Sequence, residues 1–265
     1  MQDLSKKIPF LSLRKKLWKS WPYHFYIKMY DQFLRIFVSY NTSGIRIIFV
    51  NGMRRSGNHY LIKTIMESSD ATVLFYNNLK PYSVRPTVIG GVETKLVAKK
   101  KVLVILGYED LSASDFNSSC EIMIKHCFEG LPYKKLLICR DVRNVMASRL
   151  NHAHMAFGLR EKLEIRNATK KLWTDHHSTF NLQDINRIRY GYLQEDLKKI
   201  NLESFYVSGI RVNNKISNRY GGGSSFDSNN FNERFRKFIG REDYEYLIKD
   251  LQPLDNKIHN TNWEV

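Results

Sequence analysis

The chain has 265 residues, 43% of them hydrophobic, and carries 42 lysines and arginines against 26 aspartates and glutamates, a formal net charge of +16. This composition is not that of a low-complexity chain, and it predicts a packed core of one large α/β domain or two small ones. The excess of positive charge predicts an anionic partner, which could be a nucleic acid, an acidic membrane surface, an acidic polymer or a multiply charged cofactor.

Residues 1–43 form the first distinctive segment. They mix Lys and Arg with Leu, Trp, Tyr and Phe, and helical spacing is plausible on both sides of Pro22. We predict a basic, aromatic-rich helical extension that packs on the main domain, residues 44–265. The alternative is a surface that rests on an anionic membrane.

From Ile45 onward, apolar runs alternate with helical patterns. We predict strands over Ile45–Asn51, Ala71–Asn77, Val102–Tyr108, Lys134–Arg140 and Ile185–Leu193. We predict helices from about Gly57 to Ser68, over Asn117–Leu131, Asp141–His154, Arg160–Phe180 and Gln194–Ile200, and two more within Asn229–Leu251 that hinge near Gly240. Uninterrupted apolar strands between helices predict an α/β domain whose central parallel sheet is covered by helices on both faces.

Cysteine, histidine and hydropathy patterns bear on metals and on the compartment. The three cysteines form no CxxC pair and read as buried, reduced residues, and the clustered histidines lack a metal-ligand pattern with supporting carboxylates, so we expect no metal site. There is no run of about 18 uncharged apolar residues and no signal-peptide core. We therefore expect a cytoplasmic protein, with peripheral contact at the inner face of the membrane as the accompanying hypothesis.

The stretch "GMRRSGNHYL", Gly52–Leu61, follows the first predicted strand and has the outline of a phosphate-binding loop. A nucleoside-triphosphate P-loop would continue with Lys and then Ser or Thr, whereas this loop has Asn58 and His59 there. Gly57 lets the backbone approach an anion, and the Arg55 guanidinium can donate two hydrogen bonds to it. Ser56 and Asn58 add short donors, so the loop suits a phosphate or sulfate group without an evident magnesium ligand.

We predict a second anion-binding site where the strand Lys134–Arg140 ends. Arg140 terminates this strand, and Ser148 follows eight residues later, two turns into the next helix. Both side chains are expected at the carboxyl edge of the sheet, where open α/β folds bind ligands. Two such anion-binding sites in one domain indicate a ligand with two separated anionic groups.

These motifs resemble those of sulfotransferases that use 3′-phosphoadenosine-5′-phosphosulfate (PAPS). "RRSGNHYL" resembles the 5′-phosphosulfate loop of that family, and "LLICRDVRNVMASRL" is similar to its 3′-phosphate motif. "IRYGYLQEDLKK" resembles its "YEDL" segment, and "NRYGGG" resembles its late Arg-x-Gly loop. The resemblance, which covers about Ile45 to Gly240, implies a P-loop-like sulfotransferase fold. It also implies PAPS binding by the following residues: Arg55, Ser56, Gly57, Asn58, His59, Tyr60, Arg140, Ser148, Tyr190, Arg219, Tyr220 and Gly221.

The departures from the family pattern favour carbohydrate-type members. Arg55 stands where many members have Lys, although carbohydrate-modifying members commonly have Arg. Asn58 and His59 replace the usual hydroxyl residues, and the late loop lacks the Trp-Lys pair of small-molecule members. The resemblance therefore implies transfer of the sulfuryl group of PAPS to a hydroxyl of an acceptor, for which we expect a glycan or glycolipid.

The family implies in-line transfer, with Arg55 stabilising the leaving phosphate and a base that takes the hydroxyl proton. The candidate base is Glu109, at the end of the strand Val102–Tyr108, and His59 is the second candidate. Two other functions stay open at this stage. A P-loop kinase is disfavoured by the missing Gly-Lys-Ser/Thr, and a non-enzymatic nucleic-acid-binding protein lacks a recognisable binding motif.

Overall fold

A computed structural model describes residues 44–97, 101–178, 184–210 and 234–259. The described residues from Arg46 onward belong to one unit, which runs from Arg46 to Val265. The predicted N-terminal extension, residues 1–43, lies outside the described residues, as does the predicted glycine loop around Gly221.

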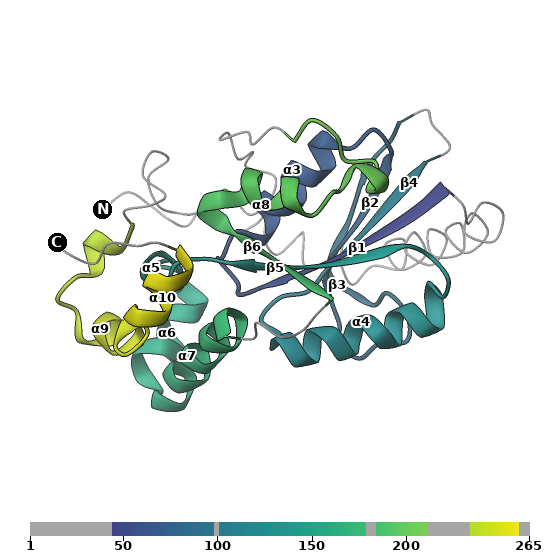
Figure 1. Cartoon of the computed structure of the whole chain (residues 1–265). Coiled ribbons are helices and arrows are strands. Elements are labelled where there is room, and N and C mark those ends of the chain that lie inside the picture. The colour runs from purple at the N-terminus through teal and green to yellow at the C-terminus, as the bar shows by residue number, and fades with distance from the viewer. Residues whose placement is uncertain (1–43, 98–100, 179–183, 211–233, 260–265) are drawn as a thin grey trace, which may run out of the picture. The chain divides into compact units, whose positions relative to one another are not determined.

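A six-stranded sheet forms the centre of this unit, with the strand order β3-β2-β4-β1-β5-β6 (Figure 1). The strands are β1 (Ile45–Gly52), β2 (Thr72–Leu79), β3 (Val88–Lys95), β4 (Val102–Gly107), β5 (Tyr133–Cys139) and β6 (Ile185–Arg189). The pairs β1–β5, β2–β4 and β5–β6 are parallel, and the edge strand β3 runs antiparallel to β2. The predicted α/β class with a central, mostly parallel sheet is confirmed.

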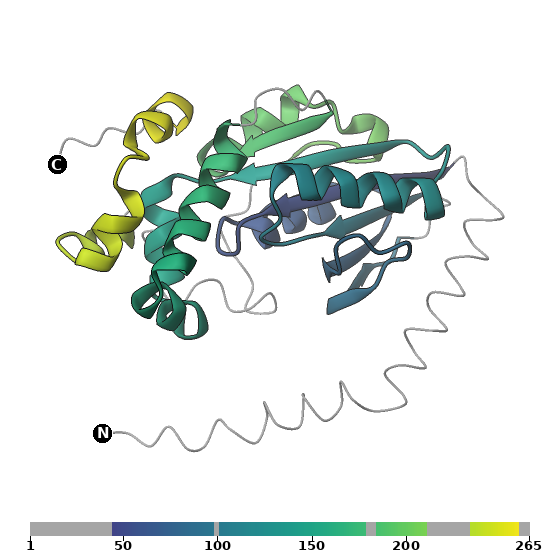
Figure 2. The ribbon, with the colours of Figure 1, turned by 90° about the horizontal axis from the view of Figure 1, so that it is seen from below.

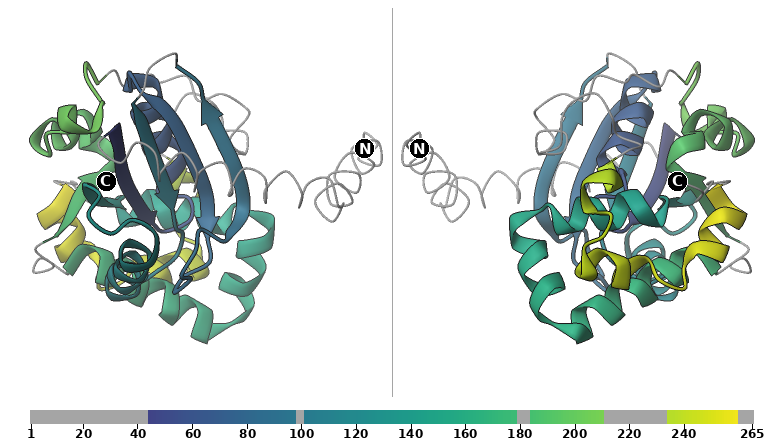
Figure 3. Two further views of the ribbon diagram at one scale, coloured as in Figure 1. Left: turned by 90° about the vertical axis from the view of Figure 1, so that its right-hand side faces the viewer. Right: turned by 90° about the vertical axis from the view of Figure 1, so that its left-hand side faces the viewer.

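Helices cover both faces of the sheet. They are α3 (Asn58–Ser68), α4 (Ala113–Cys127), α5 (Val142–Leu150), α6 (Ala153–Glu161), α7 (Leu163–Ser178), α8 (Leu193–Lys199), α9 (Glu242–Ile248) and α10 (Gln252–His259), with short 3-10 turns at Tyr190–Tyr192, Glu203–Phe205 and Arg234–Phe238. α3 and α8 lie on one face, α4 crosses the other, and α5, α6, α7, α9 and α10 gather beyond the carboxyl end of β5 (Figure 1, Figure 2). Figure 3 shows the same layers from the right-hand and left-hand sides of Figure 1.

Each layer has its own core. The side chains of β1, β2, β4 and β5 that face α3 and α8 form one apolar cluster, which includes Val50, Phe75 and Ile138. A second cluster joins α5, α7 and α9 around Trp173, which is fully buried. Parallel strands buried on both faces read as continuous apolar runs, which explains why these four strands were recognisable from sequence.

Several boundaries differ from the sequence-based predictions. The edge strand β3 was not predicted, because it contains the glycine pair Gly90–Gly91 and lies half-exposed. The predicted helix Asp141–His154 is two helices, since α5 ends at Leu150 and α6 starts at Ala153. The predicted strand Ile185–Leu193 ends at Arg189 and continues as a 3-10 turn. α10 was missed because of Pro253, a residue that the first turn of a helix tolerates.

The cysteines are reduced in the structure. Cys120 and Cys139 are buried, and burial raises the pKa of the Cys139 thiol to about 12. Cys127 is half-buried, and its thiol donates to the Val84 carbonyl oxygen at 3.1 Å. None of the helices within the described ranges is long and apolar enough to cross a membrane.

Candidate functional site

The site lies at the carboxyl edge of the sheet, where the neighbouring strands β4, β1 and β5 end. Gly52 closes β1, Glu109 follows β4 by two residues, and Arg140 follows β5 directly. Because these strands are neighbours in the sheet, segments that are far apart in sequence converge there. This edge is the expected ligand position of an open α/β fold.

The loop between β1 and α3 is a tight turn built on glycine. Gly57 has a φ of 109°, in the left-handed region, and precedes the first residue of α3. Its carbonyl oxygen accepts hydrogen bonds from the N–H groups of Tyr60 and Leu61 at 2.9 and 3.0 Å. The Ser56 N–H donates to the Met53 carbonyl oxygen at 2.9 Å. The backbone N–H groups of Gly57 and Asn58 have no acceptor in the part of the chain that the structure describes, so both are available to an anion.

The short polar side chains of the loop bind the loop itself. The Asn58 side chain donates to the Gly52 carbonyl oxygen at 3.2 Å and accepts from the Ser56 hydroxyl at 3.4 Å. A Cβ atom on Gly52 would stand 2.3 Å from both the Asn58 and Ile138 side chains, so only glycine fits. The sequence predicted Ser56 and Asn58 as donors to the anion, whereas in this structure their side chains are buried and hold the turn closed.

Arg55 and Arg140, called here the arginine pair, connect the two predicted anion-binding sites. The Arg55 Nε donates to the Ser148 hydroxyl at 3.2 Å, and an Nη of Arg140 donates to the Arg55 carbonyl oxygen at 3.2 Å. Arg140 and Ser148 are only 3% and 1% exposed, so this side of the loop is shielded from water. The two anion-binding sites predicted from sequence are therefore contiguous.

The electrostatics of the arginine pair favour an anionic ligand. The pKa of Arg55 is lowered, first by burial and then by the nearby Arg140 charge, and the Glu109 carboxylate opposes this only in part. Arg55 forms no ion pair with any residue of the described ranges. A lowered pKa means that charged Arg55 is less stable in the folded than in the unfolded chain, and a bound anion would offset this cost.

Tyr190, which the resemblance placed at the adenine, covers the loop from the end of β6. The Arg140 guanidinium lies 4.3 Å from the centre of the Tyr190 ring, and the Tyr60 ring lies 5.6 Å away at a tilt of 49°. A Cβ atom on Gly57 would stand 2.4 Å from the Tyr190 ring. Tyr190 thus fixes both the glycine turn and the orientation of Arg140.

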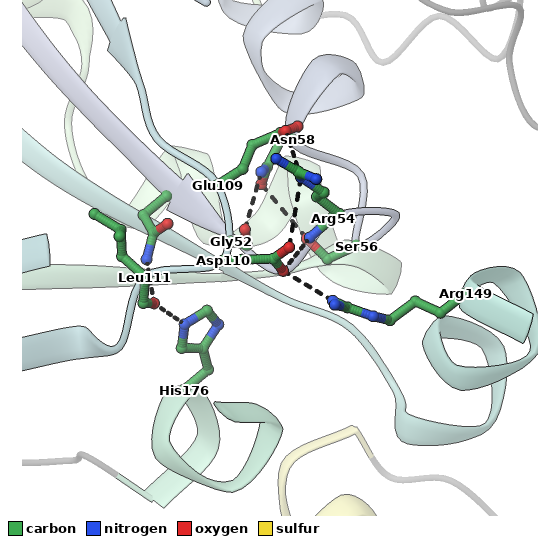
Figure 4. Close-up of polar contacts among 10 residues, drawn as sticks. Gly52, Arg54, Ser56, Asn58, Glu109, Asp110, Leu111, Arg149 and His176 are labelled. Carbon is green, nitrogen blue, oxygen red and sulfur yellow. Dashed lines mark hydrogen bonds and ion pairs between the residues drawn. The ribbon is translucent and has the colours of Figure 1, made fainter. Parts of the chain in front are cut away.

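On the other side of the loop, four charged residues form what we call the ion-pair quartet (Figure 4). The Arg54 Nε lies 3.2 Å from a Glu109 carboxylate oxygen and 3.5 Å from an Asp110 oxygen. Asp110 also accepts from the Arg54 N–H at 2.9 Å and from an Nη of Arg149 at 2.8 Å. The Asp110 N–H donates to the Gly52 carbonyl oxygen at 3.1 Å. Two guanidinium groups thus match two carboxylates, and Asp110 fastens the loop to the segment after β4 and to α5.

The sequence analysis did not assign roles to Asp110 and Arg149. Asp110 adjoins the candidate base and has a φ of 58°, which asparagine and aspartate tolerate better than most residues. Arg149 directly follows Ser148. Each is adjacent in sequence to a predicted site residue, which is the only signal in the sequence that places it near the site. Their contact with each other depends on the fold.

The other predicted site residues lie as follows. His59, the second candidate base, is half-buried in the first turn of α3, with its ring edge-on to Phe75 at 6.4 Å. Arg219, Tyr220 and Gly221 lie outside the described residues. Within the described ranges, no group of three or more His, Cys, Asp or Glu residues is arranged to hold a metal ion.

Two histidines, one on α7 and one on α10, form a buried pair. His177 and His259 approach through their Nε2 atoms at 3.0 Å, and the His177 Nδ1 bonds to the Trp173 carbonyl oxygen at 2.7 Å. Since the Nδ1 must donate to that carbonyl, the His177 Nε2 accepts a hydrogen bond from the His259 Nε2, so the His177 ring is neutral. Burial lowers the pKa of His259 to about 4 and that of His177 well below its usual value.

Comparisons with known proteins add little to this geometry. No family model and no curated protein matches the chain. Among solved structures, mouse sulfotransferase SULT7A1 complexed with PAP matches with a TM-score of 0.41 and 12% identity over 82% of this chain and 85% of that chain. A likeness at this level does not assign a function.

Proposed function

We propose that the protein is a sulfotransferase that transfers the sulfuryl group of PAPS to a hydroxyl group of an acceptor. The observation that carries the proposal is the shielded arginine pair: Arg55, without an ion-pair partner among the described residues, stands beside Arg140 and donates to Ser148. This donor set, together with the Gly57 and Asn58 amides, fits a ligand with two anionic groups.

The residues present match the parts of a nucleotide bisphosphate. Arg55 and the α3 amides would hold the 5′ side, and Arg140 with Ser148 would hold the 3′-phosphate. Tyr190, beside Arg140, offers an aromatic ring to the adenine side. The contact between Arg55 and Ser148 would give way as each side chain turned to its own phosphate.

PAPS, when bound, supplies the sulfuryl group and the leaving bisphosphate. Arg55 and the loop amides would stabilise negative charge that develops at the leaving oxygen. Glu109, at the carboxyl end of β4 and close enough for its charge to oppose part of the lowering of the Arg55 pKa, would accept the proton of the acceptor hydroxyl. His59 remains the alternative base.

The acceptor proposed is a carbohydrate or a glycolipid. The net charge of +16 favours an acidic or membrane-associated acceptor. The basic residues of the segment 1–43 would add contact with an anionic membrane at its cytoplasmic face.

Titration calorimetry with 3′-phosphoadenosine-5′-phosphate (PAP) tests the proposal. PAP should bind with and without EDTA, because the predicted contacts are all protein groups, and ATP with magnesium should bind much more weakly. Equal binding of ATP–magnesium, with no binding of PAP, would favour the kinase alternative. Labelled PAPS presented to a panel of hydroxyl acceptors would then identify the substrate.

A further inference from the structure

The consecutive residues Arg54 and Arg55 point to opposite sides of the loop. Arg55 has a φ of 75°, in the left-handed region, so the chain turns sharply between the two side chains. Arg55 reaches Ser148 on α5, whereas Arg54 reaches Glu109 after β4. Arg54 therefore stands on the side where the proposed base lies, away from the proposed nucleotide contacts.

The Arg54 side chain donates a hydrogen bond from only one of its three guanidinium nitrogens within the described part of the chain. Its shortest contacts with Glu109 and Asp110, at 3.2 and 3.5 Å, are both made by Nε. Within the described part of the chain its terminal nitrogens make no hydrogen bond, and the side chain is 48% exposed, against 17% for Glu109. The two terminal nitrogens of a half-exposed guanidinium form a fork of N–H donors that fits a carboxylate, phosphate or sulfate group.

The same contact restrains Glu109. One carboxylate oxygen is occupied by the Arg54 Nε at 3.2 Å. To accept a proton from a hydroxyl, Glu109 needs an oxygen within hydrogen-bond reach of that hydroxyl, and in this structure the Arg54 guanidinium occupies one of its two oxygens. An anionic group on the acceptor would give Arg54 another partner, and Glu109 would then have both carboxylate oxygens available to the hydroxyl.

We propose that Arg54 is a specificity-determining residue that binds an anionic group on the acceptor and, in moving to it, releases Glu109. The inference rests on the proposed sulfotransferase function and narrows it to hydroxyl compounds that carry a carboxylate, phosphate or sulfate close to the reacting hydroxyl. Asp110 stays behind as the partner of Arg149, so the loop keeps its anchor while Arg54 moves.

Three sugars that differ only at C6 test the proposal on the full-length, PAP-loaded protein: 4-nitrophenyl β-D-glucoside, its 6-phosphate and 4-nitrophenyl β-D-glucuronide. The parent protein should bind the phosphate or the glucuronide about tenfold more tightly than the neutral glucoside, the worth of one forked contact at a half-exposed site. The ratio between the two anionic sugars tells phosphate from carboxylate. Absence of any preference in the parent overturns the proposal.

Two variants assign the preference to Arg54. Arg54→Gln should abolish it, whereas Arg85→Gln, which removes the same charge from an exposed residue between β2 and β3, should retain it. Arg54→Lys keeps the charge but not the fork, and should reduce the preference to about threefold. A preference that survives intact in Arg54→Gln or Arg54→Lys overturns the assignment.

PAP affinity, measured on the same samples, separates this inference from the proposed function. A parent protein that does not bind PAP contradicts the sulfotransferase proposal itself. A parent that binds PAP but treats the three sugars alike contradicts only the role of Arg54. A variant that loses PAP affinity together with the preference shows that Arg54 supports the loop, which also contradicts the role.

Discussion

The two sides of the loop between β1 and α3 carry the same kind of residues in opposite electrostatic states. On the side of α5, Arg55 and Arg140 lie together in a shielded environment, and the pKa of Arg55 is lowered. On the side of β4, Arg54 and Arg149 are matched by Glu109 and Asp110 at 2.8–3.5 Å. Each carboxylate of the quartet has a guanidinium partner, whereas Arg55 has no carboxylate partner among the described residues and Arg140 lies 4.0 Å from its sequence neighbour Asp141.

This difference indicates what each side is for. Matched, hydrogen-bonded charges stabilise the folded chain, and removing one partner leaves the other uncompensated. Like charges held together in a buried place cost stability and persist where a ligand relieves them. The quartet therefore reads as the anchor of the loop, with Glu109 as its reactive member, and the arginine pair as a binding site for anions.

The largest expected effect comes from the base. Glu109→Gln keeps the shape of the side chain and removes its basicity, so turnover with PAPS and an accepted hydroxyl compound should fall about 10²–10⁴-fold. PAP affinity should change little, because the proposed nucleotide contacts lie on the other side of the loop. His59→Asn is the control and should weaken PAP binding more. Turnover of Glu109→Gln near the parent rate would transfer the role to His59.

The next effect concerns the arginine pair. Arg140→Ala should weaken PAP binding by about 1.5–3 kcal/mol, the range for a hydrogen bond to a charged group. Adenosine-5′-phosphosulfate lacks the 3′-phosphate, so its binding should change much less. Arg140→Lys, the matched control, retains the charge and should lose less affinity for PAP. Equal losses for both nucleotides would mean that buried Arg140 supports the fold rather than the ligand.

A smaller effect is expected from protonation of the buried histidine pair, His177 and His259. His259 has a pKa of about 4 in the folded chain, below the ordinary value of 6.5, and its neighbours include Arg140. As pH falls from 6.5 towards 4, the unfolded chain takes up a proton that the folded chain refuses, so the free energy of unfolding falls by up to about 1.4 kcal/mol per pH unit for each such histidine.

Thermal unfolding of the unliganded protein between pH 7 and 5 measures this loss, in a range where most carboxylates are still ionised. The decline should be shallower in His259→Gln, which removes the titrating ring. A melting temperature that stays constant over this range in the parent would show that the histidine pair accepts protons in the folded state.

The sequence predicted the arginine pair better than the quartet, for a physical reason. Gly57, Arg55, Arg140 and Ser148 lie in local patterns, a glycine turn before a helix and a strand end followed by two helical turns, and these patterns are visible without the fold. The contact of Arg54 with Asp110 spans 56 residues, and that of Asp110 with Arg149 spans 39. Such partners become neighbours only through the order of β4, β1 and β5, which periodicity does not reveal.

The same distinction holds for the fold. The buried strands β1, β4 and β5 are continuous apolar runs and were predicted close to their actual bounds. The edge strand β3, with its adjacent glycines and half-exposed side chains, has no such pattern, and its existence depends on pairing with β2. The inward orientation of Ser56 and Asn58 was likewise unpredictable, because it follows from the lack of space around Gly52.

Thermal unfolding of Arg55→Gln and Asp110→Asn, each with and without PAP, tests the central claim most directly. Both variants remove one charge from the loop region, but from opposite sides. Without PAP, Arg55→Gln should melt at or above the parent temperature, whereas Asp110→Asn should melt several degrees lower, at about 2–4 °C per kcal/mol for a domain of this size. PAP should raise the melting temperature of Asp110→Asn but not that of Arg55→Gln. If Arg55→Gln instead melts as low as Asp110→Asn and is still stabilised by PAP, the arginine pair is a structural feature and the proposed binding site is wrong.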